Sequence, residues 1–100
     1  MKVMMDGERV TEIGKMLHLE AVDAEAMGFY LIKGEGGPKF VEVIERMMHD
    51  PSGLKHWYPT AVGVLAKSTP VHSWSFDEHE WCEVDFPADL QFARQIVARW

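Results

Sequence analysis

Cysteine is almost absent from this sequence, which contains a single one, Cys82, among 100 residues. One cysteine cannot form a disulfide within its own chain, so a disulfide-stabilised secreted scaffold is excluded and a reducing compartment is expected. No apolar run approaches the roughly 20 residues that span a bilayer, and residues 1–20 lack the apolar centre of a secretion signal. The sequence therefore predicts a cytoplasmic protein without a membrane segment.

Basic residues are also scarce, with 10 lysines and arginines against 16 aspartates and glutamates and a formal net charge of −6. Nucleic-acid binding normally needs a basic surface, so we do not expect that role. An acidic chain still binds a nucleotide when a divalent cation mediates the contact, and it suits a ligand with a positive head group. The 47% hydrophobic content fits one compact domain with a core of modest size.

The order of apolar patterns predicts one small α+β domain over residues 1–100, with the element order β-β-β-α-α-β-β-α. A hairpin is expected over residues 2–14, because two short runs flank the turn dipeptide Asp6-Gly7, although the alternation in its second run is imperfect. The other expected strands cover 26–33, 69–77 and 80–85. The expected helices cover 37–50, 57–67 and 87–99, the first with an i,i+4 pair of Glu42 and Arg46.

Carboxylates gather where the last expected strand meets the last expected helix. Alternate residues of a strand share a face, so Trp81, Glu83 and Asp85 should point the same way. Asp85 would stand at the carboxyl end of the strand, where open α/β sheets bind ligands, and carboxylate oxygens suit Mg²⁺. The same stretch also makes a sound helix start, with Pro87 at the first helical position and Asp89 near the positive helix end. Both interpretations stand on these residues.

Four aromatic residues also admit two interpretations. Exposed together, they would form a cage for a quaternary ammonium group through cation–π attraction, but aromatic residues are more often core. The four are Trp57, Tyr58, Trp74 and Trp81. A zinc site is not expected, because the spacing of His72, His79 and Cys82 matches no established ligand pattern.

Four segments of the sequence, taken in order, resemble parts of a known family. They are residues 2–15 (KVMMDGERVTEIGK), 23–33 (DAEAMGFYLIK), 57–74 (WYPTAVGVLAKSTPVHSW) and 81–94 (WCEVDFPADLQFAR). This series resembles the carboxyl-terminal half of the nucleotidyltransferases, nearest to the phosphocholine and sugar-phosphate cytidylyltransferase-like group. The resemblance implies the carboxyl-terminal half of the nucleotide-diphospho-sugar transferase α/β fold. That family transfers a nucleotidyl group from a nucleoside triphosphate to a phosphorylated acceptor with the help of Mg²⁺.

Carried over by position, the resemblance implies a role for several residues of this chain. Asp85, with Glu83 on the same strand, matches the metal-holding end of that strand, and Lys15 matches a lysine close to phosphate. The remaining substrate-side positions are Glu25 and Gly28 of the acceptor pocket, Tyr58, and Trp81 on the strand leading to the metal. Next to Tyr58 the family often has acidic residues where this chain has Pro59 and Thr60.

Two features of that family have no match in this sequence, and their absence changes the expected function. These 100 residues match neither its glycine-rich phosphate loop nor its first strand-end aspartate. That family works by positioning phosphates and ions, so we expect no nucleotidyl transfer from this polypeptide alone. The favoured function is a truncated transferase-like protein that covers its exposed apolar surface and sheet edge by forming a homodimer. The alternatives are a binding module for a choline-like or phosphorylated compound, and one chain of a split enzyme whose second chain supplies the loop.

Overall fold

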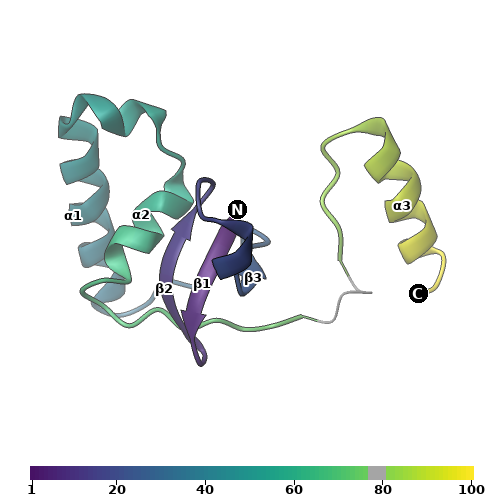
Figure 1. Ribbon diagram of the computed structural model, residues 1–100, viewed down its shortest axis with the longest axis horizontal. Coiled ribbons are helices and arrows are strands. Elements are labelled where there is room, and N and C mark those ends of the chain that lie inside the picture. The colour runs from purple at the N-terminus through teal and green to yellow at the C-terminus, as the bar shows by residue number, and fades with distance from the viewer. Residues whose placement is uncertain (77–80) are drawn as a thin grey trace.

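The sheet is the centre of the fold in the computed structural model, which describes residues 1–76 and 81–100 (Figure 1). Its strands are antiparallel in the order β2-β1-β3, and they cover Lys2–Asp6 (β1), Arg9–Gly14 (β2) and Ala24–Glu25 (β3). The α-helices in the described residues are α1 (Gly36–His49), α2 (Tyr58–Leu65) and α3 (Pro87–Val97). Short 3-10 helices cover Leu19–Ala21 (η1) and Pro51–Lys55 (η2). The α+β class predicted from the sequence is confirmed.

The predicted hairpin is present, and it explains the imperfect alternation of its second strand. Gly7 has a φ of 62°, a left-handed conformation that glycine adopts without strain. The pairing of β1 with β2 shifts between Met4 and Met5, which marks a β-bulge. Because of this shift Val10 and Ile13, three residues apart, are both buried.

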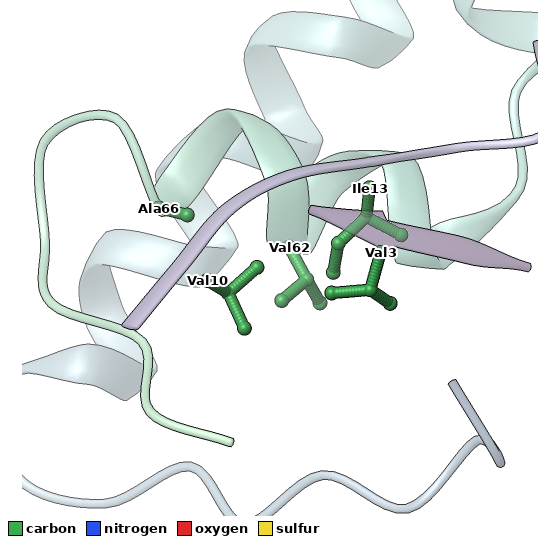
Figure 2. Close-up of a cluster of buried hydrophobic side chains, with 5 residues drawn as sticks. All are labelled: Val3, Val10, Ile13, Val62 and Ala66. Atoms are coloured by element: carbon green, nitrogen blue, oxygen red, sulfur yellow. The ribbon is translucent and has the colours of Figure 1, made fainter. Parts of the chain in front are cut away.

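The core lies between this hairpin and α2. Its buried residues are Val3, Val10, Ile13, Val62 and Ala66 (Figure 2). The helix approaches the strand closely, since a Cβ placed on Gly63 would lie 3.1 Å from the backbone nitrogen of Ile13. Each fully buried aliphatic side chain here contributes about 1.5–3 kcal/mol relative to an exposed one.

Helix α1 covers α2 and forms a second cluster. Val43 of α1 is buried together with Ala61 and Leu65 of α2. The apolar side chains of α1 are only partly covered, because Val41 and Met48 stay more than half exposed. The predicted i,i+4 pair is confirmed, with the Arg46 guanidinium donating to Glu42 over 2.7 Å.

The strand expected over 26–33 is wrong. β3 ends at Glu25, and Gly28, with a φ of 88°, turns the chain out of the extended conformation. The segment keeps one further bond to the sheet edge, from the Ala26 N–H to the Met1 carbonyl over 2.8 Å. Phe29 and Leu31, which suggested a half-buried strand, are more than 80% exposed.

The last two expected strands are also not formed in the described residues. Within 69–76 the pairing with the hairpin is limited to an isolated bridge between His72 and Arg9. The hydrogen bonds beside it join the Val10 N–H to the Val71 carbonyl (2.8 Å) and the Ser73 N–H to the Glu8 carbonyl (2.7 Å). Residues 81–86 belong to no strand, and 77–80 lie outside the described residues. Since the N–H of Asp85 donates to the Asp89 carboxylate, the end of this segment serves the following helix rather than a sheet.

Helix α3 starts as the sequence predicts. Pro87 is its first residue, and the Asp89 carboxylate accepts hydrogen bonds from the backbone N–H groups of Phe86 (2.9 Å) and Asp85 (3.1 Å). Figure 1 shows α3 well separated from the sheet and from α1 and α2. Among the described residues, it makes no extensive contact with another helix or strand.

Candidate functional site

Three of the predicted site residues take part in contacts at the start of α2: Lys15 with Trp57, and Gly28 with Tyr58. Lys15 directly follows β2, and its ammonium nitrogen lies 3.7 Å from the centre of the Trp57 ring. Its backbone is held as well, because the Lys2 ammonium donates to the Lys15 carbonyl over 3.0 Å. The lysine side chain is therefore placed by a strand end on one side and an indole face on the other.

Tyr58 connects α2 to the segment that turns at Gly28. The Tyr58 hydroxyl donates to the Gly28 carbonyl over 3.1 Å, and the Tyr58 and Tyr30 rings meet edge to face, 5.5 Å apart. The positive φ of Gly28 aims that carbonyl, so a side chain at this position would be strained. We call Lys15, Gly28, Tyr30, Trp57 and Tyr58 the α2-start cluster.

The Tyr30 hydroxyl is a buried titratable group of this cluster. Burial raises the pKa of Tyr30 above its usual 10.0, and the neighbouring Tyr58 raises it further. Within the described residues this buried hydroxyl has no hydrogen-bond partner. Tyr30 is thus neutral at physiological pH and supplies an uncharged wall.

Glu25 lies in β3, opposite Lys2 of β1, and its carboxylate is 3.7 Å from the α-amine of Met1. Its side chain is 71% exposed, and it makes no hydrogen bond or ion pair with the α2-start cluster in the described residues. The expectation that Glu25 and Gly28 line one pocket remains a prediction.

The predicted metal residues lie on the segment before α3. Trp81 is half-buried there, while Glu83 and Asp85 are exposed. Over residues 1–76 and 81–100, no group of three or more histidine, cysteine or acidic side chains is gathered to hold an ion. The Asp89 carboxylate is already used by two backbone N–H groups, which leaves Glu83 and Asp85. Two carboxylates suit Mg²⁺ only when phosphates and waters supply the remaining oxygens. His79, considered for zinc, lies outside the described residues.

Three of the four aromatic residues considered for a cage or for the core lie outside the core, while Trp81 is half-buried. Trp57 is 61% and Trp74 is 86% exposed, and Tyr58 is also exposed. The face of Trp57 is covered by the chain's own cation, Lys15. A quaternary ammonium group would therefore have to displace Lys15 to use this ring.

Two hollows beside the cluster were not expected from the sequence. An apolar groove of about 160 Å³ runs between α1, η2 and α2. Its walls include Ile44, Met47, Met48, Trp57, Tyr58 and Ala61. Met47 and Met48 at the end of α1 are visible in the sequence, but the exposure of Met48 is known only from the structure.

The second hollow, of about 300 Å³, is more polar, and Arg46, Asp50 and His56 contribute to it. Its charges already have partners. Arg46 is paired with Glu42, and the Asp50 carboxylate accepts from the backbone N–H (2.9 Å) and the hydroxyl (2.8 Å) of Ser52. The hydrogen bond from the Ser52 backbone N–H lowers the pKa of the Asp50 carboxyl most, and the bond from the Ser52 hydroxyl lowers it further. This hollow therefore offers little free charge to a ligand.

No protein-family model, curated protein or solved structure matches this chain. No helix in the described part of the chain is both long and apolar enough to cross a membrane.

Proposed function

We propose that this chain is the acceptor-side half of a nucleotidyltransferase-like protein, and that its α2-start cluster binds the phosphate group of a small phosphorylated compound. The observation that carries the proposal is the position of Lys15, whose ammonium group is held over Trp57 at the start of α2. The ordered resemblance of four segments to that family supports the same function. A cytoplasmic location agrees with the single cysteine.

The chemistry of the cluster favours phosphate over a choline-like cation. A lysine ammonium group has three N–H donors and a compact charge, and the indole face satisfies none of these donors as a hydrogen-bond acceptor would. In the described residues Lys15 forms no ion pair with a carboxylate. Its donors are therefore free to meet an anionic oxygen, while its charge repels a second cation from the same ring.

Catalysis would need more than these residues. Phosphoryl and nucleotidyl transfer depend on groups that hold the triphosphate and on Mg²⁺ that neutralises its charge. Glu83 and Asp85 would hold that Mg²⁺ together with ligand phosphates, and the ion would orient them for displacement. Because these 100 residues match no triphosphate loop, transfer would require such a loop from outside them.

The binding proposal is tested by titrating the protein with phosphocholine and, separately, with choline. Two-dimensional ¹H–¹⁵N NMR resolves the indole N–H signals of the four tryptophans, and Trp57→Phe assigns one of them. Phosphocholine should shift the Trp57 signal with saturation, and choline should not. Lys15→Met should abolish the shift, whereas Lys67→Met, which removes an exposed lysine at the end of α2, should leave it unchanged.

Two results would refute the site. One is an equal response to choline and phosphocholine, and the other is an unchanged phosphocholine titration in Lys15→Met. The metal residues are tested in the same samples by adding Mg²⁺ to the phosphocholine complex. Mg²⁺ should shift the indole signal of Trp81 in the wild type but not in Asp85→Asn, and an equal shift in both would remove Asp85 from the metal site.

A further inference from the structure

The chain exposes far more surface than a compact protein of its mass. Its accessible surface is 8145 Å², whereas a folded monomer of this mass exposes roughly 5,800 Å². Its radius of gyration is 15.5 Å, against about 13 Å for a compact domain of this length. Roughly 2,300 Å² per chain is therefore surface that a compact fold would bury.

Exposed apolar side chains on α3 and its flanks contribute to this surplus surface. Phe86, Phe92 and Trp100 are 71%, 51% and 83% exposed, and Leu90 and Val97 are also exposed. Ile96 is buried but belongs to neither core cluster. An isolated helix of eleven residues is marginal in water, and most helices are stabilised by packing their apolar side. Helix α3 thus has the composition of a packed helix, but no other helix or strand in the described part of its own chain packs extensively against it.

We propose that α3 packs on residues 1–76 of a second copy of this chain, and that the second α3 does the same in return. Such an exchange is self-complementary, so it closes as a two-fold dimer and leaves neither helix exposed. If both chains bury their surplus, the interface covers roughly 4,600 Å², within the range of obligate homodimers. This proposal does not depend on the phosphate site.

The apolar groove between α1 and α2 is the surface that would receive the helix. Its walls are almost entirely apolar, and Met48 at its edge is 56% exposed. Methionine side chains adapt their shape, which suits a groove that must close around phenylalanine and leucine. Charge does not oppose the contact, because residues 87–100 carry two arginines and one aspartate while residues 1–76 are net acidic.

Sedimentation velocity across micromolar concentrations tests the assembly. We expect a dimer, and we expect Phe92→Glu on α3 and Met48→Glu at the groove each to raise the dimer Kd roughly tenfold or more, as loss of an interface anchor does. The matched control is Gln95→Glu, which adds the same charge to an exposed position of α3 and should leave the Kd unchanged. Far-ultraviolet circular dichroism confirms that each variant is folded.

A cross-linking experiment identifies the contact itself and does not rely on destabilising variants. The photoreactive residue p-benzoylphenylalanine replaces Phe92, and ¹⁵N-labelled and unlabelled copies are mixed before illumination. The expected product joins position 92 of one isotopic copy to the Met47–Met48 peptide of the other. A compact or elongated monomer, a dimer that Phe92→Glu leaves intact, or cross-links confined to one copy would each overturn the proposal. So would a chain that associates only with a separate protein, which is the split-enzyme outcome.

Discussion

Gly53 is the position where one added methyl group should change stability most clearly. It is buried in η2, where its N–H donates to the Asp50 carbonyl and its own carbonyl accepts from the His56 N–H. A Cβ at this position would overlap the carbonyl oxygen of Met47 and lie 2.7 Å from the carbonyl carbon. Both atoms are backbone of the last turn of α1, so no side-chain rotation relieves the clash.

The cost of Gly53→Ala follows from what has to move. Displacing the Met47 carbonyl weakens its 3.2 Å bond from the Asp50 N–H, worth about 0.5–1.5 kcal/mol. Overpacking adds about 1–3 kcal/mol, so we expect a loss of about 2–4 kcal/mol of unfolding free energy. For a domain of this size that lowers Tm by on the order of 10–25 °C.

Thermal unfolding followed by circular dichroism measures this loss, and Gly37→Ala is the matched control. A Cβ on Gly37, near the start of α1, meets no atom within 4 Å, and alanine is favoured over glycine in helices by up to about 1 kcal/mol. Gly37→Ala should therefore keep or raise Tm. A Gly53→Ala protein that unfolds at the wild-type temperature would show that α1 and η2 are not packed as described. Because η2 leads into Trp57, the phosphocholine response should also weaken in Gly53→Ala.

Two further predictions concern single side chains. Burial and Tyr58 raise the pKa of Tyr30, so the folded state holds that proton more tightly than the unfolded state, and stability should fall as pH rises from 10.0 toward the raised pKa. Tyr30→Phe should lack this alkaline loss in urea titrations while matching the wild type at pH 7; an identical alkaline loss in both would contradict the assignment. Asp89→Ala removes the acceptor of two N–H groups at the start of α3, so helix content at 222 nm should fall, at a cost of about 0.5–2 kcal/mol to that helix. Asp89→Asn should retain most of the signal, and an unchanged spectrum in Asp89→Ala would show that α3 does not need this cap.

The elements that sequence reasoning placed well depend on neighbours along the chain. The hairpin needs a glycine at the turn, α1 needs an apolar stripe and an i,i+4 pair, and α3 needs Pro87 and Asp89 at its start. Each of these features acts within a few residues. They are visible in the sequence for that reason.

The strands expected over 26–33, 69–77 and 80–85 are absent from the described parts of these segments, because a strand also needs continuous hydrogen bonding to a neighbouring strand, which spacing alone does not reveal. Phe29 and Leu31 have strand-like side chains, yet Gly28 turns this segment out of the sheet. Sequence reasoning also misplaced Asp85, because a strand-like pattern does not show which contacts the residue makes. Asp85 was expected at a strand end, but its N–H is bound by Asp89, so the local helix start decides its geometry.

By itself, the sequence determined the α+β class, the hairpin turn, and the starts of α1 and α3, because these follow from local propensity and spacing. Only the tertiary structure decided that Lys15 lies on Trp57 and that Tyr58 reaches Gly28, 30 residues away in the chain. It also decided that α3 is left without a helix or strand packed against it in the described part of its own chain. Contacts between distant residues depend on how the elements pack, and that packing is a property of the whole chain which no short pattern encodes.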